Sequence, residues 1–378
     1  MKHRFAVLDV FRGIFASLVF LFHLKAFSDT PVLNNAFINH SDIFVDFFFV
    51  LSGFVICYTY QAISDPRELM LFYKKRFLRL YPLHFVMLLV FVLIELSKTF
   101  FAGHVQIHQI DNPNNNIISF LSNLFLLNSV RMPGVTDVSW NIPSWSISAE
   151  WIAYLLFAGI TFYVNRSGLS KYKNGVYIGV SVLALILLYG ITGGFRLTYS
   201  FDYGFLRGIS GFFLGAFCFN VFSYSRPYFL KLKSSFYTVA EVALLTLMII
   251  MVTLGETLKE YGFVFEVLFF ISVLIFAFEG GIISNLLKKS PLLQRIGTYS
   301  YSIYMTHAFL ISLVNIVFIR LLKFSPASYG YLFILNYYII YKVSQFTYKN
   351  IELRFNYKKK TAPKHEVGVS NPEEYRTP

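Results

Sequence analysis

Ionisable side chains interrupt the apolar runs of this sequence at spacings that could support acid–base chemistry. The first run holds Asp9, Arg12 and His23. At 100° per residue, Arg12 and His23 fall within about 20° of one helical face, and His23 lies about 16 Å further along the helix. An imidazole there is a candidate general base for a hydroxyl group. In the simpler alternative, Asp9 and Arg12 pair with each other and His23 caps the helix.

Other apolar runs carry charged residues at the same end as His23. Asp46 and Glu150 are the candidate carboxylates, because a carboxylate orients an imidazole and stabilises its protonated form. We predict that the fold brings both close to His23, with His307 as the rival base. Supporting positions nearby are Trp145, Ser146 and Arg207.

A second candidate site is basic. Arg76 and Arg79 stand three residues apart and share a helical face, which suits an anionic phosphate group. In the alternative, these arginines bind no ligand and only reflect the excess of basic residues in cytoplasmic loops. His104 and His108 stand four apart in a loop rich in Gln and Gly, so we expect neither zinc nor any other metal site.

The composition indicates where these residues are held. Of 378 residues, 56% are apolar and 14% are charged, including 44 Phe and 26 Tyr, and the mean hydropathy is +0.57. Soluble proteins carry about 25% charged residues. The composition excludes a disordered chain and argues against a soluble enzyme. Cys57 and Cys218 both lie in apolar runs and do not form a disulfide framework.

Ten apolar runs approach the roughly 20 residues that a helix needs to cross a bilayer. We therefore predict an all-α, polytopic membrane bundle of about ten transmembrane helices. The first apolar run follows the basic residues of MKHR and so resembles a signal peptide. The charged residues Asp9 and Arg12 inside this run argue instead for a helix that is not cleaved off. The predicted spans are 6–26, 41–63, 80–102, 144–165, 174–193, 203–224, 236–254, 262–285, 297–319 and 328–349.

The distribution of basic residues predicts the orientation. Alternate connections, counted from the N-terminus, hold 23 of the 33 Lys and Arg residues, and the opposite connections hold 7. Cytoplasmic loops collect such residues, so both termini are expected in the cytoplasm. The net charge of +13 then reflects topology, and no nucleic-acid partner is needed. Residues 1–350 form the membrane domain, 351–378 a charged and disordered tail, and 117–127 a short segment along the membrane interface.

Six segments in register resemble the acyltransferase-3 family of integral-membrane O-acyltransferases, which modify bacterial surface glycans. The likeness covers most of the chain, from about 8 to 310. The segments are LDVFRGIFASLVFLFH (8–23), FVDFFFVLSGFVI (44–56), YKKRFLRLYP (73–82), PSWSISAEWIAYLLF (143–157), LRGISGFFLGAF (206–217) and YSIYMTHAFL (301–310), the last including Ser302 and His307.

The resemblance implies transfer of an acetyl or other short acyl group from cytoplasmic acyl-CoA to a hydroxyl of an extracytoplasmic glycan or lipid-linked sugar. It implies a multi-pass protein of the bacterial inner membrane, without a permanently bound cofactor. Arg12, Arg76 and Arg79 would bind the donor, and His23 would act as general base or as transient acyl carrier. The protein would act alone or with a separate extracytoplasmic partner. A transporter or flippase, and a membrane scaffold without chemistry, are the alternatives from other classes.

Overall fold

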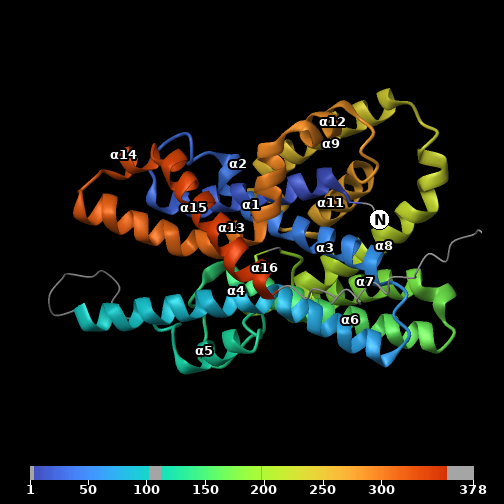
Figure 1. Cartoon of the computed structure of the whole chain (residues 1–378), viewed down its shortest axis with the longest axis horizontal. Helices are drawn as coiled ribbons and strands as arrows, with labels where there is room; N and C mark the ends of the chain where they lie inside the picture. Colours follow the sequence, from blue (N-terminus) through green and yellow to red (C-terminus); the bar gives the residue numbers. More distant parts are fainter. Residues whose placement is uncertain (1–3, 102–111, 197, 356–378) are drawn as a thin grey trace, which may run out of the picture.

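The computed structural model describes residues 4–101, 112–196 and 198–355, and within them every regular element is helical. The membrane-sized helices follow the predicted apolar runs, and shorter helices connect them (Figure 1). The long helices are α1 (Ala6–Leu24), α3 (Phe44–Tyr60), α4 (Pro66–Phe101), α6 (Trp145–Arg166), α7 (Lys173–Thr192), α8 (Gly204–Phe229), α9 (Ser234–Thr253), α11 (Phe263–Phe276), α13 (Pro291–Asn315) and α15 (Phe333–Thr347). The short helices are α2 (Ala36–Asn39), α5 (Ile117–Leu124), α10 (Gly255–Leu258), α12 (Ile282–Lys289), α14 (Pro326–Gly330) and α16 (Leu353–Phe355).

Eight helices in the described part of the chain are long and apolar enough to cross a membrane. The all-α membrane bundle predicted from the sequence is therefore confirmed. The other two predicted spans correspond to α11 and α15, which have 14 and 15 residues. The count of ten crossings stays a prediction.

The predicted span 262–285 is not one helix. It ends as α11 at Phe276, and α12 begins at Ile282. Between them, the backbone N–H of Gly281 donates to the buried Glu241 carboxylate at 3.0 Å, and that of Ser284 donates to it at 3.1 Å. A carboxylate at a helix N-terminus satisfies N–H groups that lack an intrahelical partner. Glu241 therefore stabilises the N-terminus of α12.

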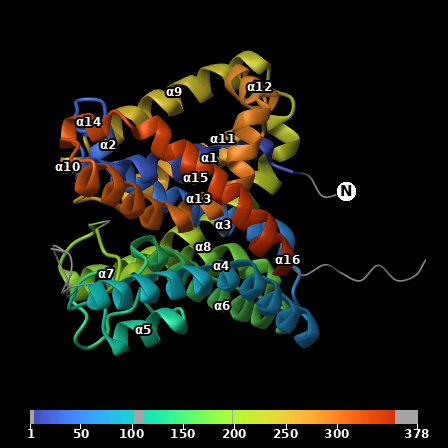
Figure 2. The same cartoon turned by 60° about the vertical axis from the view of Figure 1, so that its left-hand side comes forward.

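α3 lies at the centre of the bundle, between two groups of helices. Figure 2 shows α4, α6, α7 and α8 below it, and α1, α13 and α15 above it. α3 packs along α8, and α1 packs along α13. The core between them is rich in phenylalanine, including the fully buried Phe44, Phe47, Phe54, Phe212 and Phe213.

Two helix pairs approach so closely that their backbones touch. A side chain at Gly53 of α3 would overlap the carbonyl of Phe212 in α8, and one at Gly215 would overlap the carbonyl of Val50 in α3. The same reciprocal contact joins Gly13 of α1 to Gly297 of α13. Small residues allow such close crossings between membrane helices. The second contact places Arg12 directly against α13.

α4 is longer than the sequence analysis predicted. The connection 64–79 was expected to precede a span beginning near residue 80, but 66–101 form one helix of 36 residues that contains Pro82. A proline inside a helix removes only one hydrogen bond, and packing can offset that loss. The basic run of Arg76 and Arg79 is therefore helical and points into the bundle.

The short segment α5 turns its polar side toward the protein. Ser119 and Asn123 are buried, whereas Ile117 and Leu121 are exposed. The side chain of Asn116 caps the start of the helix by accepting from the backbone N–H of Ser119 at 3.0 Å. An outward apolar side agrees with the lipid contact that the sequence predicts for 117–127.

The first and last described residues approach one another. Arg4 and Leu353 line the same cavity, so both ends of the described chain lie on one side of the bundle. Residues 351–355, which the sequence analysis assigned to the tail, are helical, and the rest of that tail lies outside the described residues. A chain that crosses the membrane an even number of times has both of its ends on the same side.

We expect the side holding Arg4 and Leu353 to face the cytoplasm, because its loops collect Lys and Arg. A tag at Gly134 should then be accessible from outside the cell, and tags at Ser170 or Lys289 only from the cytoplasm. Accessibility of single-cysteine variants to an impermeant maleimide measures this. Labelling of Gly134 only after membrane disruption would contradict the orientation.

Candidate functional site

A cavity of about 160 Å³ opens among α1, α3, α4, α6 and α13. It is lined by all three predicted donor-binding arginines and by a set of carboxyl and hydroxyl groups. The arginines are Arg12, Arg76 and Arg79, and the other polar side chains are Ser52, Ser146, Glu150, Tyr154, Ser300, Tyr301 and Tyr304. A second cavity of about 250 Å³ adjoins the first, since Arg12 and Arg79 line both. Cationic side chains that line a cavity favour an anionic ligand.

Arg12 is positioned by the close contact between α1 and α13. Its Nε donates to Ser300 Oγ at 2.8 Å, and its Nη2 donates to the Gly297 carbonyl oxygen at 3.3 Å. Asp9 pairs with it at 3.4 Å and accepts from Arg4 at 2.8 Å. Asp9 and Arg12 therefore pair with each other, as in the simpler alternative. The Arg12 side chain nevertheless also lines both cavities.

Arg76 and Arg79 have different surroundings, although both project from one face of α4. Arg76 donates to the hydroxyl of Tyr60 at 3.2 Å and stacks over its ring. In the described part of the chain, its buried Nε has no hydrogen-bond partner. Arg79 forms an ion pair with the buried Glu352 and stacks over Tyr301 at 5.2 Å. Arg76 is therefore the freer of the two for a ligand.

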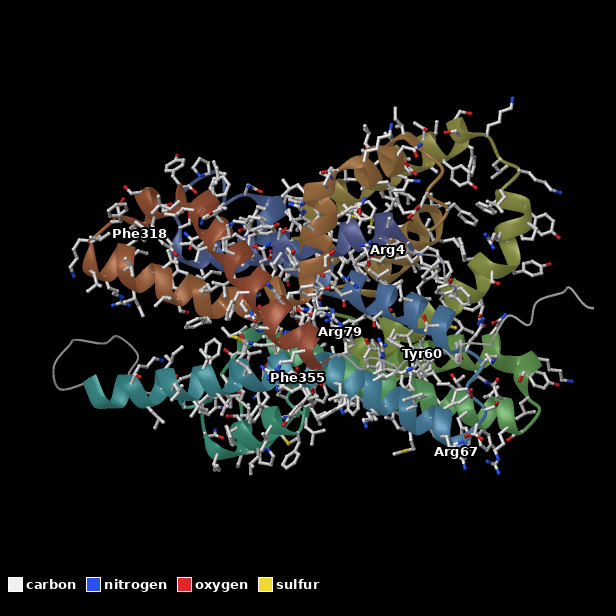
Figure 3. The ribbon with its side chains drawn as sticks, in the orientation of Figure 1. Arg4, Tyr60, Arg67, Arg79, Phe318 and Phe355 are labelled. Atoms are coloured by element: carbon white, nitrogen blue, oxygen red, sulfur yellow. The ribbon has the colours of Figure 1, made fainter. Side chains whose placement is uncertain are left out.

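The sequence analysis missed Glu352, because it lies in the segment assigned to the tail. Figure 3 shows its partner Arg79 in the middle of the molecule, close to Phe355 at the end of α16. Glu352 also accepts from the hydroxyl of Ser302, which explains how that predicted supporting residue is used. One signal was available, since Glu352 is the single acid in the basic stretch 349–360.

Glu150 lines the arginine cavity. Its Oε1 accepts from Ser52 at 2.5 Å and from the hydroxyl of Tyr154. Ser146 lies nearby and shares a hydrogen bond of 2.8 Å with Tyr304. Neither His23 nor His307 lines this cavity, so the structure groups Glu150 with the arginines. Tyr154 and Ser52 are further polar residues that sequence reasoning did not single out.

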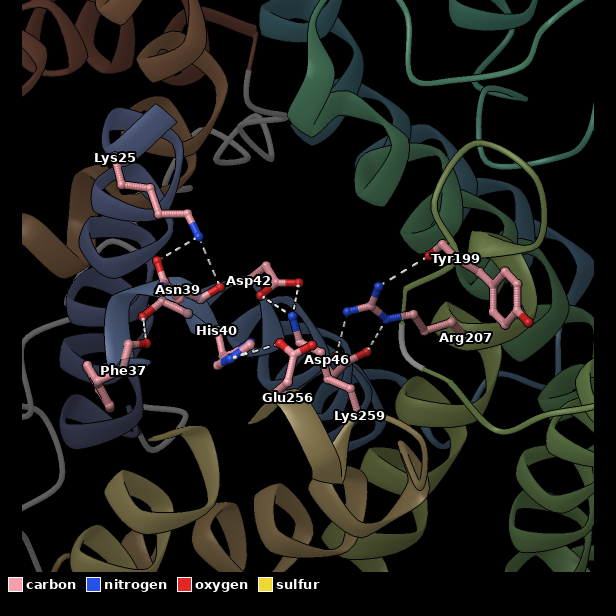
Figure 4. Close-up of polar contacts among 11 residues, drawn as sticks. Lys25, Phe37, Asn39, His40, Asp42, Asp46, Tyr199, Arg207, Glu256 and Lys259 are labelled. Carbon is pink, nitrogen blue, oxygen red and sulfur yellow. Dashed lines mark hydrogen bonds and ion pairs between the residues drawn. The ribbon is translucent and has the colours of Figure 1, made fainter. Parts of the chain in front are cut away.

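Asp46 and Arg207 form a buried pair between α3 and α8 (Figure 4). Arg207 Nε and Nη2 donate to the two Asp46 carboxylate oxygens at 2.6 and 2.7 Å, and Nη1 donates to the Tyr199 carbonyl oxygen. The guanidinium also stacks over Trp145 at 5.1 Å. The structure thus places Asp46 with Arg207 and not with His23, because a buried carboxylate is stabilised most by an opposite charge.

A polar rim lies next to this pair and joins several loops, as Figure 4 also shows. Lys259 donates to Asp42 at 2.7 Å, and Lys25 donates to Asn39 at 2.9 Å. In the described residues, no group of three His, Cys, Asp or Glu side chains could hold a metal ion. His104 and His108, the pair considered for zinc, lie outside the described residues.

His23 and His307 face each other across α1 and α13, with ring centres 5.0 Å apart. Over residues 4–101, 112–196 and 198–355, the His23 ring has no hydrogen-bond partner, and it packs against the rings of Phe22 and His307. Tyr304 connects this pair to the cavity, because its ring lies 5.8 Å from His307 and it lines the cavity itself. The structure therefore brings together the two rival bases.

Comparisons with known proteins identify the family of this chain. A family model described as an acyltransferase domain matches residues 5–341. A protein named "Acyltransferase MdmB" from Streptomyces mycarofaciens is 32% identical over 116 residues, which are 30% of this chain and 27% of that protein. The chain thus matches less than a third of the relative's length. No solved structure is similar enough to match. Because the family model covers nearly the whole chain, the protein belongs to the acyltransferase-3 family, and its apolar helices make it an integral-membrane protein.

Proposed function

We propose that the protein transfers an acetyl or other short acyl group from acyl-CoA to a hydroxyl of an extracytoplasmic surface glycan or lipid-linked sugar. The observation that carries this proposal is the cavity inside the bundle, where three arginines meet Glu150 and several hydroxyl groups. Phosphate groups of the donor would contact the arginines, and the acyl-bearing end would extend between α3, α6 and α13. No permanently bound cofactor is required, because the thioester is already activated.

The reaction needs one proton transfer and one nucleophilic attack. A base removes the proton from the sugar hydroxyl, the oxygen attacks the thioester carbonyl carbon, and the carbon–sulfur bond breaks. The coenzyme A thiolate leaves and takes up a proton. We assign the base to His23, whose ring packs against His307, which in turn packs against the cavity-lining Tyr304. In the alternative route, His23 carries the acyl group transiently before passing it to the sugar.

The proposed site has two sides, and we infer the cellular arrangement from the chemistry assigned to each side. The arginines would receive acyl-CoA from the cytoplasm, and the acceptor would reach His23 from the far side of a bacterial inner membrane. A separate extracytoplasmic protein would be the partner that presents the acceptor, if the chain does not act alone. Mass-spectrometric comparison of surface-glycan O-acetylation with and without this protein tests the function. Identical acetylation would contradict it.

We predict that Arg76→Ala weakens acetyl-CoA binding about tenfold or more, because a charge-assisted contact contributes roughly 1.5–3 kcal/mol. Arg79→Ala should also weaken it, with an added cost from leaving Glu352 unpaired. Lysine at either position should restore binding only in part, because an ammonium group lacks the bidentate fork. Isothermal titration of the purified protein in detergent measures the affinity.

Arg67→Ala is the matched control for this prediction. Arg67 lies on the same helix, is exposed, and lines neither cavity. Its replacement should leave the affinity unchanged. Unchanged affinity in both Arg76→Ala and Arg79→Ala would remove the donor assignment from this helix face.

A further inference from the structure

His307 has one nitrogen bonded and one free. Its Nδ1 lies 3.3 Å from the carbonyl oxygen of Ile303, one turn earlier in α13. A carbonyl oxygen only accepts, so this contact places the ring proton on Nδ1. Nε2 then carries a lone pair, and within the described residues it is buried without a hydrogen-bond partner. Buried acceptors are almost always paired, which makes this atom unusual.

The His23 ring lies beside the ring that carries this free nitrogen. Two imidazoles joined by an N–H···N hydrogen bond have ring centres about 5 Å apart, since an N···N distance of about 2.9 Å adds to about 1.1 Å from each centre. The rings of His23 and His307 are separated by 5.0 Å and tilted by 36°. The separation of the two rings therefore matches the one that such a hydrogen bond requires.

The carboxylates expected to orient His23 are engaged elsewhere. Both oxygens of Asp46 accept from Arg207. Glu150 accepts from Ser52 and Tyr154 and lines the arginine cavity. No described side chain is hydrogen-bonded to His23, and the His307 ring packs against it.

We propose that His307 is the positioning residue of the base: His23 donates one N–H to His307 Nε2 and presents its other nitrogen to the acceptor hydroxyl. This inference rests on the proposed acyl transfer. His23 takes the hydroxyl proton as the oxygen–carbon bond forms and the carbon–sulfur bond breaks, and it then returns that proton to the thiolate. His307 stays neutral throughout and holds the His23 ring in the reactive tautomer.

Two substitutions at residue 307 separate this role from a structural one. The side-chain oxygen of glutamine reaches about as far as Nε2, so His307→Gln keeps an acceptor for His23. The amide of asparagine reaches only as far as Nδ1, so His307→Asn keeps the bond to Ile303 and loses the acceptor. A purely structural role predicts the opposite order of activities.

The assay uses membranes that contain each variant, with radiolabelled acetyl-CoA as donor and the host envelope as acceptor. We expect His307→Gln to retain kcat within about tenfold of the parent and His307→Asn to lose at least about tenfold more, with KM for acetyl-CoA unchanged in both. Comparable kcat values in the two variants, or the reverse order, would overturn the proposal.

A second measurement is independent of activity. In protein labelled with ¹⁵N-histidine, we expect His307 to show a protonated Nδ1 and an unprotonated Nε2, and the Nε2 signal to shift in His23→Ala. His40→Ala is the control, because His40 lies in the polar rim and contacts neither ring. An unmoved His307 signal in His23→Ala would refute the pair. A parent protein without acyl transfer would refute the proposed function, and the histidine signals would still decide the pair.

Discussion

Replacement of His23 by alanine should abolish detectable acyl transfer while the protein still inserts into the membrane. General-base assistance contributes about 10²–10⁴-fold to a rate, and the thioester needs little activation beyond it. His23 forms no hydrogen bond in the described structure, so its removal leaves no buried polar atom newly unpaired. The measurement is incorporation of radiolabelled acetyl into envelope glycan at equal protein abundance.

His40→Gln is the control for this experiment. His40 lies in the polar rim 3.6 Å from Glu256 and lines neither cavity. We expect it to retain transfer. Near-normal transfer by His23→Ala would refute both the general-base and the acyl-carrier versions. If His23→Ala abolishes transfer, incubation of the parent protein with acetyl-CoA alone separates the two versions, because only the carrier accumulates an acyl–protein adduct.

Arg207→Met should be the most destabilising single change in the bundle. It leaves Asp46, which is fully buried, without its opposite charge. Breaking one half of a buried ion pair costs about 3–5 kcal/mol, whereas replacing both halves by apolar residues is often neutral. Asp46→Leu combined with Arg207→Met should therefore recover most of the lost stability. Titration with a denaturing detergent, followed by tryptophan fluorescence, measures the difference.

The double variant also decides what Asp46 does. A stable and active double variant assigns Asp46 to a structural pair between α3 and α8. A stable but inactive one returns Asp46 to the catalytic role that the sequence analysis predicted. A double variant no more stable than Arg207→Met would show that the pair does not hold the helices together.

Helix positions could be predicted from the sequence because hydropathy is a local property. Nearly every predicted apolar run contains a helix, since a helix satisfies its own backbone groups wherever it lies. The points at which helices begin and end were harder to predict. The start of α12 depends on Glu241, which is 40 residues from Gly281. The continuation of α4 through Pro82 depends on packing with other helices.

The residues of the site could be found, but their partners could not. Arg207 pairs with a residue 161 positions away, and Arg79 with one 273 positions away. Helical periodicity shows which face a residue occupies, and it does not show which helix that face meets. Glu150 and Asp46 were therefore predicted as partners of His23, whereas the structure pairs them with Ser52 and Arg207. The choice between His23 and His307 as the base stays a prediction, although the structure places the two rings side by side.

The glycine contact between α3 and α8 limits how the protein can move during turnover. Where Gly53 and Gly215 bring two backbones together, no side chain remains that could change rotamer. The two helices must then travel as one rigid body, which keeps Ser52 and Arg207 at a fixed separation. A cavity of about 160 Å³ is far smaller than coenzyme A. For the proposed donor, we expect the space to come from the side where α4 and α13 meet through side chains, as in the contacts of Tyr301 with Leu80 and Arg79.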